Sequence, residues 1–323
     1  AGGPGVPVWG TCGGPPKPWE GRGRGSVAPG GGRHRGRAAV SLKAASRVAF
    51  QGEPGAYSDE ALAGIFGEVE RAPCRTLPQV FQAVEAGEAS SGIVPVENSY
   101  AGSINETYDL FLTSPLVIVG EVTHPVDHCL LALPGETLGN IERVLSHPQA
   151  LAQCETFLRE RGLVAVAEYD TAGSARRVAE ERLQRTGAIA GRRAARLYGL
   201  AILAESIQTA SRNFTRFLLL AREPAPPAEA AKTSIVFGTA NVPGALYRAM
   251  GAFARRELNL SKLESRPARD RTAAPATESS FEYIFYVDVE AHAALPAMQE
   301  ALADLRQVTT FLRVLGSYPR SPR

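Results

Sequence analysis

The stretch Ser211-Arg212-Asn213-Phe214-Thr215-Arg216-Phe217-Leu218 runs directly into the apolar residues Leu219 and Leu220. A short apolar run bounded by turn chemistry is typical of a buried strand, and Asn213 supplies the turn. The pattern therefore predicts a strand that carries a threonine hydroxyl and an arginine at its edge. A hydroxyl in that position can act as a hydrogen-bond donor inside a dry cleft. Thr215 would also suit the strand as plain β-branched filler.

Before this stretch, short apolar runs alternate with amphipathic segments from Arg47 onward, which indicates an α/β domain. Glycine and proline residues punctuate the alternation and separate strands from helices. The expected elements are strands at 48–50, 93–96 and 188–190, and helices that begin near Ser58, at a Ser103–Glu106 capping box, at Pro148 and at Thr171 as the N-cap.

After this stretch, residues 223–231 form a Pro-rich segment typical of a semi-rigid linker. The remainder predicts the order βαββαβ, which is the split βαβ arrangement of ferredoxin-like domains. Its predicted elements lie at 234–237, 244–258, 260–265, 281–289, 295–305 and 311–315, with an insertion at 268–280. The sequence therefore divides into a leader at 1–46, an α/β domain at 47–222, the linker at 223–231, a ferredoxin-like domain at 232–319 and a tail at 320–323.

The chain has 323 residues, enough for two domains, and a net charge of +2. Residues 1–45 hold seven of the 35 basic residues and one of the 33 acidic residues, which leaves 28 and 32 for the rest. Because the rest of the chain is slightly acidic, a basic surface for nucleic acid is not indicated. No apolar run approaches the roughly 18 residues of a membrane span.

The basic, acid-poor leader resembles an organelle transit peptide, although it is rich in glycine rather than serine. Its Gly and Pro content prevents it from burying enough apolar surface to fold, so we expect it to be disordered. The alternative interpretations are a disordered tail without a targeting role, and a translated upstream fragment.

Cysteine and histidine spacing gives no sign of a metal centre. The four cysteines, Cys12, Cys74, Cys129 and Cys154, include no metal-ligand pair, and the five histidines add no ligand pattern. We therefore expect free thiols in a reducing compartment, no bound metal and no cofactor.

Polar residues recur where predicted strands run into helix starts, at 55–58, 97–99, 146–149 and 171–174. Such ends converge on a crevice in α/β sheets, and helix starts offer free N–H groups, so the layout predicts a site for a small anionic ligand. Taken singly, each residue also has an ordinary interpretation: Ser58, Ser146 and Thr171 as N-caps, Gln153 as a solvated position, His147 as a structural histidine and Asn98 as a turn residue.

Together these motifs resemble, in chain order, the prephenate/arogenate dehydratase family over about residues 47–319. The resemblance implies a two-lobed, periplasmic-binding-protein-like catalytic domain. The expected reaction removes water and carbon dioxide from arogenate to give phenylalanine, or from prephenate to give phenylpyruvate. The matching runs are Gly55-Ala56-Tyr57-Ser58, Pro95-Val96-Glu97-Asn98-Ser99, His128-Cys129-Leu130-Leu131, Ser146 through Cys154, and Asn213-Phe214-Thr215-Arg216-Phe217.

The resemblance also implies roles for single residues. Thr215 would donate to the leaving oxygen, while Asn98, Ser146 and Gln153 would orient the substrate as further catalytic residues. Thr171 and nearby backbone N–H groups would hold a carboxylate. Arg216 has two interpretations, since it could contact a substrate carboxylate or only brace the cleft. The other expected substrate-binding residues are Ser58, Glu97, Ser99, Ala172, Gly173 and Phe217.

The C-terminal region resembles the regulatory ACT domain of the same family, which implies phenylalanine as an effector. Its motifs are Gly244-Ala245-Leu246 and Glu264-Ser265-Arg266-Pro267, and Asn241 and Pro243 complete the expected effector site. An alternative for Arg266 is a surface ion pair with Glu264. Domains of this type generally pair, so we expect a homo-oligomer, either a dimer or a tetramer.

Residues 232–237 and 311–319 resemble the plant and algal branch of the family, which implies arogenate as the substrate and the chloroplast stroma as the location. Glu53, Phe214 and Ser174 depart from the usual pattern. Ser174 lies near the segment where the two substrates are thought to be discriminated, so prephenate stays open as the alternative. A non-catalytic amino-acid sensor with the same fold is the alternative from another class.

Overall fold

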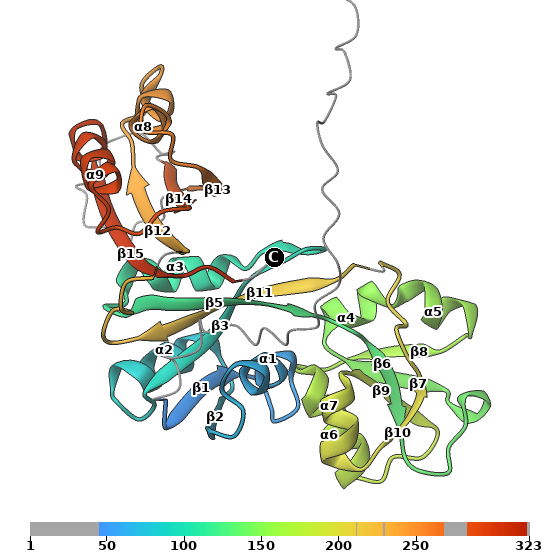
Figure 1. Ribbon diagram of the computed structural model, residues 1–323. Coiled ribbons are helices and arrows are strands. Elements are labelled where there is room, and N and C mark those ends of the chain that lie inside the picture. Colours follow the sequence, from blue (N-terminus) through green and yellow to red (C-terminus); the bar gives the residue numbers. More distant parts are fainter. Residues whose placement is uncertain (1–44, 211, 229, 268–282, 322–323) are drawn as a thin grey trace, which may run out of the picture. The chain divides into compact units, whose positions relative to one another are not determined.

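Three β-sheets order the part of the chain that the structure describes (Figure 1). The structure is a computed structural model that describes residues 45–210, 212–228, 230–267 and 283–321. The predicted leader up to residue 44, the predicted insertion at 268–280 and the last two residues of the predicted tail lie outside these ranges. In chain order the three sheets are the first, second and third sheets.

In the first sheet, β11 (Phe214–Ala221) lies between β3 (Ser91–Asn98) and β5 (Val117–Pro125) and is antiparallel to both. The run from Phe217 to Leu220 is buried, which confirms the strand predicted from it. A late segment of the chain thus joins a sheet built mostly from early ones. The other elements here are β1 (Arg47–Gln51), α1 (Tyr57–Phe66), β2 (Glu70–Cys74), α2 (Leu77–Glu85), β4 (Gly102–Ser103) and α3 (Asn105–Thr113).

Alternation along β11 assigns its side chains to two faces of the first sheet. Phe217 and Leu219 pack with α1, whereas Leu218 and Leu220 pack with α2 and α3. The helices thus cover the sheet on both faces, as expected for an α/β layer structure. Thr215 shares the face of Phe217, and Arg216 shares the face of Leu218.

The second sheet has the order β10-β6-β9-β7-β8 and is covered on both faces. Small residues of α6 and α7 pack on one face, and Leu151 and Leu158 of α4 and α5 pack on the other. Its elements are β6 (Cys129–Ala132), the 3-10 helix η3 (Leu138–Asn140), β7 (Arg143–Ser146), α4 (Pro148–Gln153), α5 (Glu155–Glu160), β8 (Val164–Ala167), α6 (Thr171–Glu180), β9 (Thr186–Ala190), α7 (Arg192–Tyr198) and β10 (Ala201–Ala204).

The third sheet has the antiparallel order β13-β14-β12-β15, which is the arrangement expected from the βαββαβ pattern. Ile235 and Phe237 face α8 and α9, while Val236 and Tyr286 pack into the core of the first sheet. Its elements are β12 (Ala231–Gly238), α8 (Ala245–Ala254), β13 (Leu260–Pro267), β14 (Tyr283–Val289), α9 (Pro296–Val308) and β15 (Phe311–Pro319).

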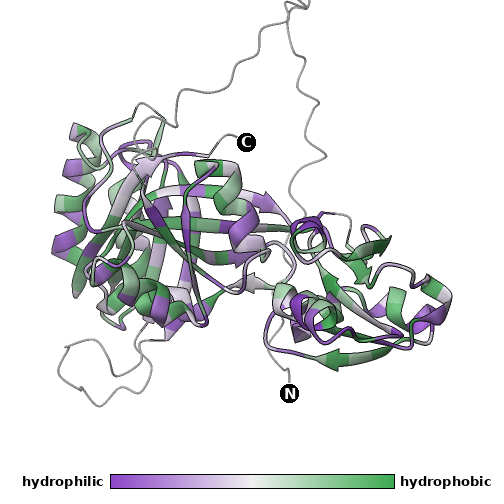
Figure 2. Cartoon of the chain, turned by 90° about the horizontal axis from the view of Figure 1, so that it is seen from below, coloured by the Kyte–Doolittle hydropathy of each residue, from purple (hydrophilic) through white to green (hydrophobic). Residues whose placement is uncertain are grey.

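The helices are amphipathic, as helices that cover sheets must be. Figure 2 shows purple and green segments along the helices, and green, white and purple stretches along the strands. Within the described ranges, no helix is both long enough and apolar enough to cross a bilayer.

Three local predictions about helices were wrong. Ser103 does not cap α3, because it lies on β4 and its hydroxyl donates to Glu264 of the third sheet. Thr171 is the first residue of α6, and the N-cap is Asp170, whose carboxylate accepts from Gly173 N. The helix predicted from Pro148, which we expected to continue through Phe157, is broken at Cys154 into α4 and α5. Pro148 does begin α4, as predicted.

Candidate active site

A cleft of about 320 Å³ is lined by residues of the first sheet and by residues of the helices and loops around the second sheet. Its volume falls in the range of small-molecule sites. The first sheet contributes Asn98, Thr215 and Phe217, and the helices α4 and α6 that cover the second sheet contribute Gln153 and Thr171. The site thus forms where the ends of strands and the starts of helices meet.

The hydroxyl of Thr215 is oriented by Asn98, its register partner on β3. The Oδ1 atom of Asn98 accepts from the backbone N–H groups of Tyr100 (3.0 Å) and Ala101 (2.9 Å), which fixes the orientation of the amide. The Nδ2 atom of Asn98 must therefore donate, and it lies 3.0 Å from Thr215 Oγ1. Because Thr215 accepts this hydrogen bond, its own proton stays available for a group in the cleft.

The same amide begins a hydrogen-bonded chain that joins the two sheets. Asn98 Nδ2 donates to Asn213 Oδ1 (2.8 Å), and Asn213 Nδ2 donates to Gln153 Oε1 (2.8 Å). His128 Nε2 lies 2.7 Å from the same Gln153 oxygen, so this nitrogen must carry a proton. The direction of every bond in this chain follows from the two backbone donors at its start.

His128 completes the chain as a neutral imidazole. Burial lowers the pKa of His128, which is 2% exposed. With the proton on Nε2, the Nδ1 atom lies 2.8 Å from the hydroxyl of Tyr57, whose single proton is shared between this nitrogen and the carbonyl oxygen of Asp127 at 3.1 Å. Both ring nitrogens are thus engaged, and the ring braces the cleft wall.

Charged groups at the rim give the cleft its electrostatic character. Arg75 lines it, with its guanidinium carbon 5.3 Å from the ring centroid of Tyr169. Asp170 also lines it, and burial raises the pKa of that carboxyl. The guanidinium of Arg75 gives the cleft a place for a carboxylate, while the raised pKa of Asp170 favours the uncharged form of that carboxyl group. No group of three or more His, Cys, Asp or Glu residues in the described part of the chain is placed to hold a metal ion.

Six of the residues predicted for substrate or catalysis line the cleft: Ser58, Asn98, Gln153, Thr171, Thr215 and Phe217. None of the three suggested N-caps, Ser58, Ser146 and Thr171, caps a helix. Gln153 is 6% exposed, and its Oε1 atom accepts a hydrogen bond from Asn213, so it is not a solvated position.

The other predicted residues are held elsewhere. Ser146 is fully buried, and its hydroxyl donates to the carbonyl oxygen of Ile189 at 2.7 Å. Ser99 accepts from Phe214 N at 2.9 Å and so ties the loop after β3 to β11. Ala172 belongs to the core of the second sheet, and Gly173 N donates to the Asp170 cap.

Glu97 and Arg216 point away from the cleft, so the prediction that they bind substrate is not kept. Arg216 forms ion pairs with Glu121 (2.7 Å) and Asp288 (2.6 Å), and Glu97 pairs with Lys262 (3.1 Å). Both contacts reach the third sheet, as alternation along β3 and β11 requires.

Sequence reasoning missed Arg75, Asn213, His128, Tyr57 and Asp170 as site residues. Asn213, His128 and Tyr57 stood inside recognised motifs, but nothing in one sequence reveals which residues share a hydrogen bond. Arg75 had a usable signal, because it lies between β2 and the start of α2. There Thr76 and Gln79 form a complete capping box.

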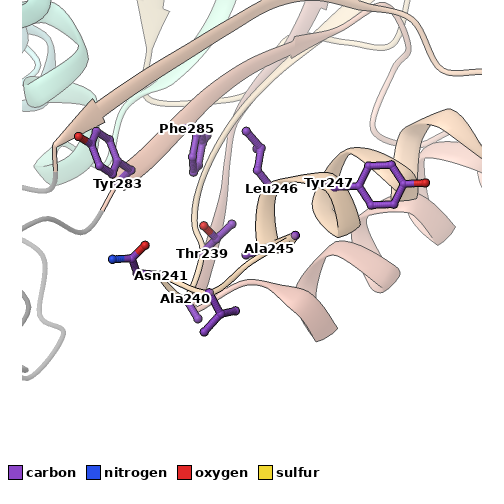
Figure 3. Close-up of a pocket in the computed structure, with 10 residues that line it drawn as sticks. Thr239, Ala240, Asn241, Ala245, Leu246, Tyr247, Tyr283 and Phe285 are labelled. Carbon is purple, nitrogen blue, oxygen red and sulfur yellow. The ribbon is translucent and has the colours of Figure 1, made fainter. Parts of the chain in front are cut away.

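A second cavity, of about 370 Å³, lies in the third sheet at the start of α8 (Figure 3). Four predicted effector residues line it: Asn241, Gly244, Ala245 and Leu246. Gly244 has a φ of +76°, a backbone conformation that favours glycine, and it is the N-cap of α8. Figure 3 shows Leu246 and Phe285 as the apolar side of the cavity and Thr239 and Asn241 as polar groups.

The remaining predicted effector residues, Pro243 and 264–267, do not line this cavity. Glu264 accepts from Ser103, and Arg266 binds the carbonyl oxygen of Asn105 and pairs with Asp109 at 3.2 Å. Ser265 is exposed on β13, and Pro267 lines a separate cavity beside α3. Arg266 is thus neither a cavity residue nor a surface partner of Glu264, because it is buried against α3.

Comparison with known proteins gives a consistent assignment. Residues 48–225 match the family model "Prephenate dehydratase". The chain is 49% identical over 276 residues to "Arogenate dehydratase/prephenate dehydratase 2, chloroplastic" of Arabidopsis thaliana, with 84% of this chain and 72% of the relative covered. The chain spans between 66% and 72% of the length of the curated relatives that it first matches.

Two solved structures have the same fold with a TM-score of 0.76. One is prephenate dehydratase of Arthrobacter aurescens in complex with L-Phe, which is 33% identical and covers 86% of this chain and 92% of its own. The other is GqqA, described as a novel type of quorum quenching acylase, which is 38% identical and covers 85% of this chain and 98% of its own. With the family model over more than half of the sequence, these matches mean that the chain belongs to the prephenate dehydratase family.

Proposed function

We propose that this chain is a decarboxylating dehydratase, a carbon–oxygen lyase that converts arogenate into phenylalanine, with prephenate as the competing substrate. The observation that carries the proposal is the orientation of the Thr215 hydroxyl, which accepts from Asn98 and keeps its proton for the cleft. The Arabidopsis relative carries both activities in its name.

The chemistry asks little of the protein, because aromatisation drives the reaction. As the ring carboxylate leaves as carbon dioxide, the electron pair of the broken C–C bond enters the ring. The C–O pair departs with the ring hydroxyl as hydroxide, which takes up a proton from solvent to become water. Thr215 donates a hydrogen bond to that leaving oxygen. Threonine is a weak acid, so the effect depends on a fixed position in a water-poor cleft.

The rim charges suit arogenate. Arg75 can pair with a substrate carboxylate, and the hydroxyl of Thr171 at the start of α6 adds a donor. Asp170 and Glu106 are carboxyl groups that also line the cleft. They favour the ammonium group that arogenate carries and prephenate lacks. Asp170→Asn should therefore shift the ratio of kcat/KM values toward prephenate.

The test is turnover of the purified chain and two variants on both substrates. Thr215→Val keeps the side-chain shape and removes the hydroxyl, and turnover should fall by about 10²–10³-fold. Turnover of the Asn98→Asp variant should fall by a similar factor. A carboxylate cannot donate to Thr215 Oγ1, so the hydroxyl would turn to that carboxylate and away from the cleft.

Thr215→Ser should keep more activity than Thr215→Val, because it retains the hydroxyl. Thr123→Val is the matched control, since Thr123 is an exposed strand threonine of the same sheet. Near-normal turnover in a folded Thr215→Val variant would overturn the mechanism. A wild-type chain that binds an amino acid without turnover would favour a sensor instead.

Feedback regulation by phenylalanine is the second part of the proposal. The L-Phe complex of the Arthrobacter relative and the cavity beside α8 support an ACT domain whose effector is phenylalanine. The apolar side chains of Leu246 and Phe285 suit an aromatic ring, and the Asn241 amide suits the polar end of an amino acid. Such coupling is usually worth about 1–3 kcal/mol. Gly244→Val should abolish phenylalanine inhibition and spare basal turnover.

Assembly and location complete the proposal. We infer a homo-oligomer, either a dimer or a tetramer. Light scattering on the purified chain would measure its mass. The chloroplastic Arabidopsis relative and the basic leader support a plastid protein of the stroma, which imaging of a fluorescent fusion would test.

The likeness to GqqA raises acyl hydrolysis as a rival activity. That chemistry needs a nucleophile activated by an adjacent base. His128 is unsuited to this role, because its nitrogens are engaged by Gln153 and Tyr57. Hydrolysis of an acyl amide at a rate above that on arogenate would reverse the ranking.

A further inference from the structure

We propose that contacts from the third sheet fix the positions of β3 and β11 on the face opposite to the cleft, with Arg216 and Glu97 as positioning residues for Thr215 and Asn98. The inference rests on the proposed function only in the role that it gives to Thr215. It concerns the residues that follow and precede the catalytic pair on β11 and β3.

The register of β3 and β11 creates two pairs that face opposite ways. Thr215 is opposite Asn98, and Arg216 is opposite Glu97. Successive side chains of a strand point to opposite faces, so one pair lines the cleft and the other faces the third sheet. Each positioning residue is a single peptide unit away from a residue of the site.

Arg216 is the centre of a buried ionic cluster shared by the first and third sheets. Its guanidinium lies 2.7 Å from Glu121 of β5 and 2.6 Å from Asp288 of β14. Lys232 of β12 pairs with the same Glu121 at 2.9 Å. Two cations and two carboxylates therefore balance, and their side chains are between 4% and 15% exposed.

Hydroxyl groups of the third sheet complete the cluster. Arg216 donates to Tyr318 Oη at 3.2 Å, and Ser234 donates to Asp288 Oδ1. Ser234 Oγ and Tyr318 Oη lie 2.7 Å apart, which links β12 to β15. Strands β12, β14 and β15 thus all reach a group that is bonded to Arg216.

A second ionic contact holds the neighbouring strand. Lys262 of β13 lies 3.1 Å from Glu97 of β3, and its own side chain is 10% exposed. Lys262 also lies 3.6 Å from Glu264, which accepts from Ser103 on β4. The side chain of Glu97 is 40% exposed, so β13 holds the strand that carries Asn98 through a weaker contact than the buried pair that joins β14 to β11.

Stability alone does not explain such a cluster. Buried ion pairs seldom stabilise more than an apolar core of the same shape, because both charges must lose water. What they fix well is geometry, since a planar guanidinium accepts only a few arrangements of its partners. The chain pays that desolvation cost next to Thr215, where position decides catalysis.

The main test is Asp288→Asn, which removes the far charge without touching the cleft. We expect kcat to fall by about 10- to 100-fold while KM stays within about twofold, because the hydroxyl is displaced and the binding groups are not. Arg216→Lys should have a smaller effect of the same kind, since it keeps the charge and loses the planar fork. Asp304→Asn is the matched control, because Asp304 lies in an ion pair on α9, away from the first sheet.

Two further measurements separate this inference from the proposed function. In a Thr215→Val background, Asp288→Asn should add no further loss of kcat, because the hydroxyl that it positions is gone. Hydrogen–deuterium exchange of β3 and β11 should rise in Asp288→Asn and not in Asp304→Asn. If the wild-type chain proves inactive on both substrates, the proposed function fails, and exchange still decides the positioning claim. A folded Asp288→Asn variant with wild-type exchange at β11 would overturn the inference.

Discussion

At the scale of single residues, the orientation of the site originates in two backbone N–H groups. Tyr100 N and Ala101 N fix the Asn98 amide, which sets the donors and acceptors as far as His128. The sequence could predict that Thr215 and Asn98 belong to one site, because both lie in motifs. It could not predict the direction of a hydrogen bond, since Asn213 and Gln153 are 60 residues apart and meet only through the fold.

The neutral state of His128 predicts a pH dependence of stability. Burial holds the folded-state pKa of His128 below the value of about 6.5 for an unfolded chain. Below pH 6.5 the unfolded state therefore binds more protons. Stability is fully present above pH 6.5 and falls as pH drops toward the lowered pKa, by at most about 1.4 kcal/mol per pH unit. Urea unfolding at pH 7.5 and 5.5 measures this loss.

His128→Gln removes the titrating group and should reduce that loss. His147, whose pKa burial also lowers, remains in both proteins and contributes equally to both. The difference between the two proteins then belongs to His128. An identical loss of unfolding free energy in wild type and His128→Gln would contradict the neutral, buried assignment.

At the scale of elements, the sequence identified the helices better than their first residues. Asp170 and Thr171 are both cap-forming types, so pattern alone could not choose between them. The backbone chooses, because Asp170 is extended, with φ −148° and ψ 148°, and Thr171 is already helical. Ser103 likewise had the right spacing from Glu106 for a capping box. Its hydroxyl instead donates a hydrogen bond to Glu264 of the third sheet.

The cap assignment predicts unequal effects of neighbouring substitutions. Asp170→Asn keeps an oxygen for Gly173 N, whereas Asp170→Ala removes it, so the alanine variant should be about 1 kcal/mol less stable than the asparagine variant. Neither variant has a carboxylate at position 170, so the difference between them does not include the cost of burying that charge. Thr171→Ala should change the unfolding free energy by less than about 0.5 kcal/mol. Denaturant unfolding measures all three variants. A larger loss of unfolding free energy in Thr171→Ala than in Asp170→Ala would mean that Thr171 is the N-cap.

At the scale of the whole described chain, sequence patterns predicted where the strands lie but not which strands pair with one another in a sheet. The apolar run that predicted β11 contains no signal that this strand lies between β3 and β5. The βαββαβ order predicted the third sheet, because short-range pattern defines that motif. It left open that Val236, Tyr286 and Leu315 would join the core of the first sheet.

The third sheet approaches the first sheet very closely at Gly316 of β15. A Cβ atom on Gly316 would overlap the backbone oxygen and nitrogen of Ile118 on β5. Since backbone atoms cannot move aside cheaply, Gly316→Ala should push the third sheet from the first. We expect a loss of about 1–3 kcal/mol in the free energy of unfolding, measured with denaturant.

Gly64→Ala is the matched control, because Gly64 lies in α1 with open space around it. That change should raise stability by up to about 1 kcal/mol, as alanine favours a helix interior. If the third sheet positions Thr215 through Arg216, Gly316→Ala should also lower kcat under conditions where the protein stays folded, and Gly64→Ala should not. A Gly316→Ala variant with wild-type stability would mean that the two sheets can separate at β15 without cost. The ionic cluster around Arg216 would then have to hold them alone.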